Sequence, residues 1–312
     1  MDNIVSTYPV DFERTAISIG YSNDMYVADM VLPRVPVMRK EFRYYEYPID
    51  ESFTVPETRV GRRSRPTMVH FTASEKSAAC EDYGLEDAIP DDDVRNTPMQ
   101  AADPISRSVM MLTDLLMIDR EQRVANLVFA DSAYGPANKT TLAGNDQWSS
   151  DHASSDPVED IVDAIEQMIV KPTHMVLGSE VWKSLRTHKA ILKSVNRNDG
   201  DAGIASREMV EDLLEVEIVV GQAWINSAKR GQDASLRRVW GKHALLYRAD
   251  PNADAMGPPT LGITAEYRGR EVRTGFNPRM GARGAHEIRV IDTCEERIIA
   301  NRAGYLFRNA VA

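Results

Sequence analysis

Cysteine is scarce in this chain of 312 residues, where Cys80 and Cys294 lie far apart and outside any paired motif. A disulfide framework or a thiolate zinc site needs more cysteines at closer spacing, so neither is expected. The first residues lack the basic start and apolar run of a secretory signal, and no later stretch has the ~20 apolar residues of a membrane span. We therefore predict a cytoplasmic protein with two reduced thiols.

Motifs for nucleotide, metal and acyl-transfer chemistry are missing as well. The sequence contains no GxxxxGK[ST], GxGxxG, HExxH, CxxC, GxSxG or EF-hand pattern. Its six histidines are scattered without partners at metal-ligand spacing. Ser179 follows a glycine, but its better use is as the N-cap of a short helix. We therefore predict no catalytic residue, no cofactor and no metal, and the chain is not expected to be an enzyme.

Basic residues are in the minority, because 37 Lys and Arg face 47 Asp and Glu, which gives a formal net charge of −10. The average surface therefore repels phosphate. One segment departs from this balance: RVGRRSR, residues 59–65, contains Arg59, Arg62, Arg63 and Arg65.

Three interpretations of this arginine cluster are open. As a nucleic-acid patch it has the charge but lacks helical spacing and interleaved aromatic residues. As a solvated strand edge it would oppose aggregation. We favour an intersubunit contact, in which the guanidinium groups meet carboxylates of a neighbouring chain. The candidate carboxylates are those of Asp91, Asp92 and Asp93, whose succession in the chain argues against a shared metal ion.

The first 82 residues predict two segments that cannot fold alone. Residues 1–38 carry three prolines between short apolar pieces, which favours an extended arm. Two strand-like segments follow, EFRYYEYPI at 41–49 and TMVHFTA at 67–73, and they predict a long hairpin across 39–82. Both segments have too little apolar content for a core, so we expect them to be buried between subunits.

Residues 103–131 predict a long helix of roughly 40 Å at 1.5 Å per residue. Asp103 is a good N-cap, and Pro104 stands at the first helical position, which tolerates proline. Apolar side chains recur at helical spacing, so we expect burial along much of the helix. Two adjacent stripes carry this pattern: Met111, Leu115, Ile118, Gln122, Ala125 and Phe129, and beside them Ile105, Val109, Leu112 and Leu116.

The rest of the chain predicts an α/β domain followed by strands. A second capped helix opens at Asp156 and Pro157, and short strands and helices then alternate to about residue 250. The acidic residues Glu159, Asp160 and Asp163 lie in the first turns of that helix, where the helix dipole favours negative charge. Two separate strands are expected within HEIRVIDTC and ERIIANRAGYLF near the end of the chain.

This order of parts, an α+β chain with arm, hairpin, long helix and inserted α/β domain, resembles the major capsid proteins of tailed bacteriophages with the Hong Kong 97-like fold. The segments that carry the resemblance are ISIGYSNDMYVADMVLPRVPV (17–37), THMVLGSEVWKSLRTHKAIL (173–192), VEIVVGQAW (216–224), VWGKHALLYRA (239–249) and GARGAHEIRVIDTCEERIIANRAGYLFRNAV (281–311). They are framework segments and carry no catalytic signature.

The resemblance implies a division of the chain and a role. The implied parts are an N-terminal arm (1–38), an extended loop (39–82), a peripheral domain (83–155) with its spine helix (103–131), an axial domain (156–250) and return strands, mainly of the peripheral domain (251–312). The implied role is self-assembly as pentamers and hexamers into an icosahedral head, built in the host cytoplasm, that encloses double-stranded DNA without sequence-specific binding.

The implied partners are further copies of the chain, a portal, a separate scaffolding protein and, as a further candidate, a decoration protein. A scaffolding protein is expected because the chain starts directly at the arm; the alternative is a leader that has been removed. Lys40 and Lys76 flank the hairpin outside any matching motif, so no covalent cross-link is expected. Two rivals stay open at this point, an encapsulin-like compartment around enzyme cargo and a soluble α/β enzyme.

Overall fold

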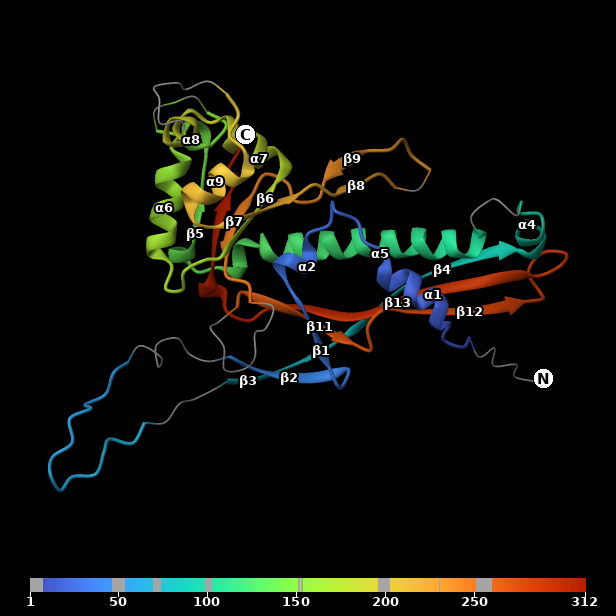
Figure 1. The fold of residues 1–312 in the computed structure, drawn as a ribbon, viewed down its shortest axis with the longest axis horizontal. Helices are drawn as coiled ribbons and strands as arrows, with labels where there is room; N and C mark the ends of the chain where they lie inside the picture. Colours follow the sequence, from blue (N-terminus) through green and yellow to red (C-terminus); the bar gives the residue numbers. More distant parts are fainter. Residues whose placement is uncertain are drawn as a thin grey trace.

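The computed structural model describes residues 8–46, 54–69, 74–98, 103–150, 152, 154–195, 203–229, 231–250 and 260–312. They form an elongated α+β molecule with two five-stranded sheets (Figure 1). The first sheet runs along the molecule beside helix α5 (Pro104–Val128). The second sheet and its helices stand at one end of α5.

The central strand of the first sheet is β13 (Ala285–Ile298). It pairs antiparallel with β4 (Glu81–Pro90), with β12 (Glu271–Asn277) and with β11 (Gly262–Tyr267), and β1 (Arg34–Val37) adds a parallel edge to β11. Helix α5 packs on this sheet through β13 and β4. Because β13 is a single strand of 14 residues, the prediction of two separate strands in this part of the chain is wrong up to Ile298.

The second sheet has the order β5 (Lys139–Thr141), β14 (Gly304–Arg308), β10 (Ala244–Tyr247), β6 (His174–Gly178) and β7 (Glu217–Gly221). Two of its strands, β5 and β14, lie outside the 156–250 segment in sequence. The helices of this region are α6 (Pro157–Gln167), α7 (Ser179–Thr187), α8 (Lys189–Val195) and α9 (Arg207–Leu214).

The remaining elements are short. The other helices are α1 (Phe12–Gly20), α2 (Ala28–Val31), α4 (Asp91–Arg95) and the 3-10 turns Asp131–Ala133, Pro136–Asn138, Gly144–Asp146 and Asn301–Ala303. Two separate strand pairs complete the described fold, namely β2 (Glu41–Glu46) with β3 (Ser74–Ala79) and β8 (Trp224–Asn226) with β9 (Leu236–Arg238).

The predicted start of the long helix is confirmed. The Asp103 carboxylate accepts hydrogen bonds from the backbone N–H of Ile105 at 3.3 Å and of Ser106 at 3.2 Å, and Pro104 is the first helical residue. These bonds satisfy donors that a helix N-terminus leaves unpaired. The helix ends at Val128, three residues before the predicted end.

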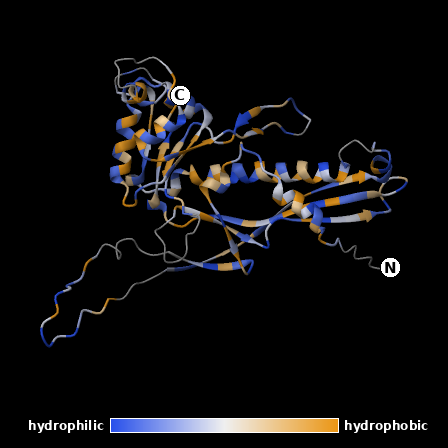
Figure 2. Cartoon of the chain, viewed as in Figure 1, coloured by the Kyte–Doolittle hydropathy of each residue, from blue (hydrophilic) through white to orange (hydrophobic). Residues whose placement is uncertain are grey.

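The predicted burial of α5 is only partly right. Ile105, Val109, Leu112 and Leu116 are buried against β12 and β13, as their stripe predicts. In the other stripe, however, the first two side chains are largely solvent-exposed, Met111 at 59 % and Leu115 at 53 %. Apolar residues are spread around this helix (Figure 2), so their spacing alone does not tell which stripe the sheet will cover.

Two cores lie on the two faces of the second sheet. One face packs against α6, α7, α8 and α9 through buried residues such as Ile161, Leu185 and Ile218. The other face packs against α2 and the end of α5, with Trp240 fully buried between them. The second sheet is therefore held to the first half of the molecule by apolar contact as well as by chain connectivity.

The expectation that the arm is buried only between subunits is wrong for much of its described part, because α1 packs on α5 and β12 and Ser18 is fully buried. Val31 and Leu32 are at most 1 % exposed and belong to the core that contains Trp240. Next to them, β1 forms four residue pairs with β11. The prolines keep this segment extended, as predicted, but its apolar side chains and backbone find their partners within the same chain.

The hairpin is confirmed, but its second strand is not the predicted one. The partner of β2 is β3, SEKSAA, while residues 67–69 are not in a strand and residues 70–73 lie outside the described residues. SEKSAA has low β-propensity, so its residue types do not predict a strand. It is a strand here because its backbone pairs with β2, and the hydrogen bond from Cys80 N to Lys40 O at 2.8 Å extends this pairing by one step. Ser179 also differs from its prediction, because it is the first residue of α7 and the N-cap is Gly178.

A glycine of the second sheet offers a test of how closely Trp240 packs against that sheet. A Cβ at Gly221 would collide with the ring of Trp240, whereas a Cβ at Gly135, whose φ is −68°, would meet no atom within 4 Å. Gly221→Ala should therefore lower the free energy of unfolding by about 2 kcal/mol, because an overpacked core strains its neighbours. Gly135→Ala should change it by less than about 0.5 kcal/mol. Denaturant unfolding of the purified subunit measures both, and equal values would contradict the packing described for Trp240.

Candidate functional site

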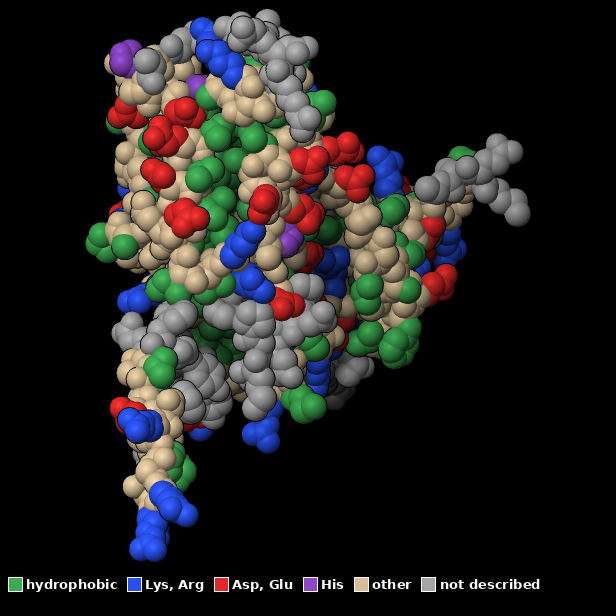
Figure 3. All heavy atoms as spheres, turned by 60° about the vertical axis from the view of Figure 1, so that its left-hand side comes forward, with side chains coloured by type: hydrophobic (Ala, Val, Ile, Leu, Met, Phe, Trp, Pro, Cys, Tyr) green, Lys and Arg blue, Asp and Glu red, His purple; other side chains and the backbone are tan. Residues whose placement is uncertain are grey.

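The arginine cluster lies on the long loop between β2 and β3. All four side chains, Arg59, Arg62, Arg63 and Arg65, are exposed, and Figure 3 shows basic side chains at the tip of this projection. Within the described residues, none of the four pairs with a carboxylate. Hydrogen bonds within the loop include Ser64 N to Gly61 O at 3.0 Å, Thr67 Oγ1 to Glu57 O at 2.8 Å and Arg59 N to Glu57 Oε1 at 3.2 Å. The guanidinium groups of this cluster are therefore exposed to solvent and available for contacts beyond the described residues.

Apolar side chains accompany these arginines. Val55 is 81 % exposed and Met68 78 % exposed on the same loop. A solvent-exposed loop that carries both guanidinium groups and large apolar side chains has the composition of a protein contact. A loop that served solubility alone would not need the exposed valine and methionine.

The acidic run forms the short helix α4, and two of its side chains already have partners. Asp91 is 8 % exposed and pairs with Arg95 at 2.6 Å and with His286 at 3.3 Å. Asp92 pairs with Arg283 at 2.7 Å. The carboxylate of Asp93 has no such partner among the described residues. Figure 1 places α4 and the arginine loop at opposite ends of the molecule, so the two groups do not meet within one chain.

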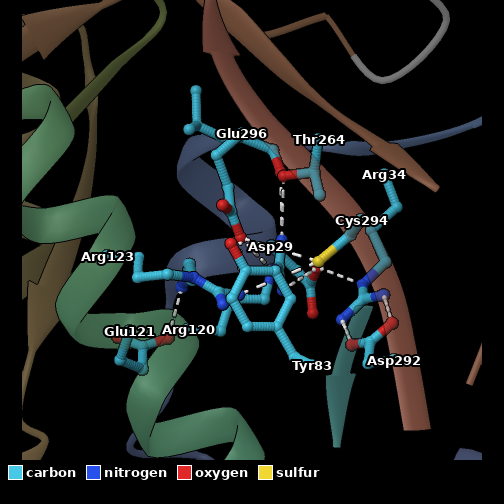
Figure 4. A network of polar contacts seen from close by, with 12 residues as sticks. Asp29, Arg34, Tyr83, Arg120, Glu121, Arg123, Thr264, Asp292, Cys294 and Glu296 are labelled. Atoms are coloured by element: carbon cyan, nitrogen blue, oxygen red, sulfur yellow. Dashed lines mark hydrogen bonds and ion pairs between the residues drawn. The ribbon is translucent and has the colours of Figure 1, made fainter. Parts of the chain in front are cut away.

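A second polar site, which the sequence did not reveal, lies where the arm, α5 and the first sheet meet (Figure 4). Arg120 of α5 is 4 % exposed. Its guanidinium group pairs with Asp29 at 2.6 Å and donates to Thr264 Oγ1 at 3.0 Å. Thr264 in turn donates to the carbonyl oxygen of Leu32 at 3.0 Å. One buried arginine thus joins the helix to the arm and to β11.

Arg34 of β1 completes this junction from the arm. It makes a bidentate pair with Asp292 of β13, with distances of 3.2 Å and 3.0 Å, and it also contacts Asp29 at 3.0 Å and Glu266 at 2.5 Å. Bidentate arginine–carboxylate pairs fix orientation as well as adding energy. The network therefore sets the position of β1 on the first sheet.

A third arginine ties the outer side of α5 to β13. Arg123 pairs with Glu296 at 2.9 Å, and its guanidinium carbon lies 3.4 Å from the centre of the Tyr83 ring. Arg120 approaches the same Glu296 carboxylate at 3.6 Å. Strand β4, which carries Tyr83, is thereby linked to the same network.

Glu121 connects α5 to the second sheet. Its carboxylate is 1 % exposed and accepts hydrogen bonds from Ala28 N at 2.6 Å and from Trp240 Nε1 at 2.7 Å. Burial raises the pKa of Glu121, although these two hydrogen bonds partly oppose that effect. Arg120 and Glu121 thus both hold the arm at α2, while Arg120 also binds β11 and Glu121 also binds Trp240.

The charges of the network shift the pKa of its other members. Burial by itself would raise the pKa of Asp292, but the hydrogen bonds and charge of Arg34 lower it below the ordinary value of 3.8. Burial raises the pKa of the Cys294 thiol to about 12, helped by the charges of Asp292 and Glu296. This thiol stays protonated near neutral pH, which does not favour reactivity.

The described residues offer little for chemistry beyond ion pairing. Among them, no group of three or more His, Cys, Asp or Glu side chains could hold a metal ion. Both cysteines are buried and free. In the same part of the chain, every helix is too short or too polar to cross a membrane.

The sequence contained a weak signal for the buried network. Arg120 and Glu121 lie in the charged segment DREQR (119–123) of the long predicted helix, where any charged side chain that faces the sheet would need partners. Their partners come from Ala28, Asp29, Thr264 and Trp240, which are distant in the chain. Spacing along the sequence could not have identified these partners.

Comparison with known proteins identifies similar chains. The family model described as phage major capsid protein E matches residues 126–235. The major capsid protein of Pseudomonas phage JBD67 is 40 % identical over 98 % of this chain and 98 % of its own.

Solved structures share the fold at lower identity. A phage-related protein from Bordetella bronchiseptica RB50 has a TM-score of 0.75 and 20 % identity, covering 97 % of this chain and 98 % of its own. The encapsulin of Synechococcus elongatus PCC 7942 has a TM-score of 0.54 and 12 % identity, covering 99 % of this chain and 92 % of its own.

The Arg34–Asp292 pair offers a test by pH. Asp292→Asn should lower the free energy of unfolding at pH 7 by about 2 kcal/mol, less than for a buried pair broken completely, because Arg34 keeps Glu266 and Asp29. Since the native pKa of Asp292 is lowered, the wild type gains this stability above pH 3.8 and loses it as the pH falls through the native pKa. The difference between the two proteins should therefore shrink towards zero in acid.

Asp119→Asn is the matched control, because Asp119 is 54 % exposed and pairs with Arg123 at 3.1 Å on the surface of α5. Its effect should stay below about 0.5 kcal/mol. Denaturant unfolding between pH 7 and pH 3 measures both variants. A pH-independent loss in Asp292→Asn would show that the charge of Asp292 is not what holds β1.

Proposed function

This chain belongs to the phage major capsid proteins, and from that premise we propose that its copies assemble as pentamers and hexamers into an icosahedral head around double-stranded DNA. The protein is a structural component of the capsid shell rather than an enzyme, and its place is the virion capsid. Assembly in the host cytoplasm is part of the proposal.

The observation that carries the assembly model is the loop between β2 and β3. It projects from the body of the molecule with exposed apolar side chains and four arginines whose guanidinium groups pair with no carboxylate of the described residues. Burial of this loop against a neighbouring copy would remove apolar surface from water and neutralise the guanidinium groups. We therefore keep Arg59, Arg62, Arg63 and Arg65 as intersubunit residues.

The parts of the chain then take the following roles. The arm (1–38) and extended loop (39–82) link subunits, although the arm is also anchored within its own chain. The peripheral domain (83–155 with most of 251–312) forms the flat part of the shell around α5. The axial domain (156–250), whose sheet also takes in β5 and β14, gathers around the five-fold and six-fold centres.

The acidic partner group needs one refinement. Because Asp91 is buried and Asp92 is paired in its own chain, Asp93 is the member with a carboxylate available to a neighbour. Asp91 and Asp92 would then help by positioning α4 and by adding negative potential. All three residues therefore stay in the proposed contact, Asp93 as the direct partner and Asp91 and Asp92 in supporting roles.

The net charge of the chain bears on how the proposed shell would hold its DNA. A net charge of −10 favours weak contact with DNA, so that DNA is enclosed without sequence-specific binding. A portal, a separate scaffolding protein and a decoration protein are the further partners that this role requires or permits.

An encapsulin-like compartment is the second candidate, because the encapsulin of Synechococcus elongatus shares the fold over nearly the whole chain. Particles produced in the native phage context distinguish the two. DNA inside the shell supports the head, and enzyme cargo without DNA would favour the compartment. The 40 % identity to a phage capsid protein makes the head the better supported choice.

Charge reversal tests the arginine loop. Arg62→Glu with Arg63→Glu should reduce shell yield at least tenfold, because like charges would then face the acidic partner, while the unfolding midpoint of the subunit stays unchanged. Arg62→Lys with Arg63→Lys is the matched control, which keeps the charge and loses the bidentate geometry. Electron microscopy and sedimentation measure the shells, and normal shells from the glutamate variant would disprove the contact.

The assignment of the partner has a separate test. Adding Asp93→Arg to the double glutamate variant restores opposite charges if this position faces the arginine loop, and Asp92 is kept because it pairs with Arg283 in its own chain. We expect partial recovery of shells from this triple variant. If the variant folds but shells do not recover, the arginine contact still stands and its acidic partner is a different group.

A further inference from the structure

The axial region carries an acidic stripe that its own chain does not neutralise. Exposed carboxylates without an ion-pair partner among the described residues recur on two adjacent helices: Glu159, Asp163 and Glu166 on α6, and Glu208 and Asp212 on α9. Figure 3, in which this side of the molecule comes forward, shows acidic side chains gathered on the upper part of the molecule.

The helix dipole does not account for this stripe. It favours Glu159 at the start of α6, but it opposes Glu166, which stands next to the last residue of that helix. Glu159, Asp163 and Glu166 are spaced by four and three residues, so they also repel one another on one face. Between them Val162 is 45 % exposed, and Met209 on α9 is 50 % exposed. An acidic face with apolar residues inside it has the composition of a contact for a basic surface.

A basic surface lies on the other side of the same region. The ribbon of β8 and β9 is a separate two-stranded pair, and Figure 1 shows it extending away on the side opposite α6. Lys229 and Arg237 are exposed on it and have no carboxylate partner among the described residues, and Asp233 is the exposed carboxylate that lies between them in the chain. A two-stranded ribbon is marginally stable by itself, so it gains from an external partner.

One face of this ribbon has the residue types of a strong protein contact. The pairs Trp224–Arg238 and Asn226–Leu236 lie on the same face, whereas Arg237, the partner of Ile225, lies on the other face. The Arg238 guanidinium carbon lies 3.9 Å from the centre of the Trp224 ring, and Leu236 is 64 % exposed. Trp and Arg are enriched among residues that dominate binding energy.

We propose that the β8–β9 ribbon of one copy docks on the acidic α6–α9 face of the next copy, and that this contact closes the capsomer ring. The two surfaces have opposite charge and lie on opposite sides of one region, so the contact is head-to-tail. A head-to-tail contact between identical chains generates a ring when its rotation closes. This inference rests on the proposed ring assembly and adds the surfaces that hold neighbouring copies together.

The test reverses charge on the ribbon without touching its stacked pair. Lys229→Glu with Arg237→Glu should lower the association constant for ring formation at least tenfold, and Asp163→Lys with Glu166→Lys should do the same. Combining the four substitutions should restore most of the loss, because the charges are again opposite. Native mass spectrometry and sedimentation measure the rings, and circular dichroism checks the fold.

Arg107→Glu with Arg279→Glu is the matched control, since both arginines are exposed and the change in net charge is the same. It should leave ring formation within about twofold. Wild-type rings should also weaken when salt rises from about 0.05 M to about 0.5 M, because screening reduces charge attraction.

The outcomes separate this inference from the proposed function. If the wild type forms neither rings nor shells in the native phage context, ring assembly itself fails. If the wild type forms rings and the ribbon variant forms them with the same association constant, only the ribbon contact is overturned. An equal loss in the control, or no recovery in the fourfold variant, would also overturn it.

Discussion

The position of the arm and of both sheets depends on the charged side chains that α5 carries at two neighbouring positions. Arg120 binds Asp29 and Thr264, while Glu121 binds Ala28 N and Trp240 Nε1. Buried charges are stable only when they are paired and hydrogen-bonded, so each partner has to be in place. The requirement ties the arm, the first sheet and the second sheet to one turn of one helix.

This central anchoring explains how the molecule can carry exposed extensions. The β2–β3 loop and the β8–β9 ribbon contribute little to the described cores, whereas the arm is held by Arg34, Leu32 and the ladder to β11. A body that is stable by itself can leave these surfaces open for other copies. In a shell protein such an arrangement lets the subunit fold first and associate afterwards.

The charged side chains show the same division between a closed interior and an open surface. Inside the molecule, the arginines at 34, 120 and 123 face carboxylates of distant segments. On the surface, the loop arginines and the acidic stripe of α6 are left without partners among the described residues. Paired charges inside set the fold, and unpaired charges outside are available to set which surfaces of neighbouring copies meet.

The sequence by itself determined the α+β class, the capped start of α5, the hairpin and the extended β1, because caps, prolines and alternating side chains act over a few residues. It could not select which stripe of α5 is buried, or place SEKSAA beside β2, or join the last strands into β13. These three features depend on which surfaces and backbone groups come together from segments that are far apart in the chain. The tertiary structure alone decided them, together with the partners of Arg120 and Glu121, since these contacts join residues about 90 to 140 positions apart.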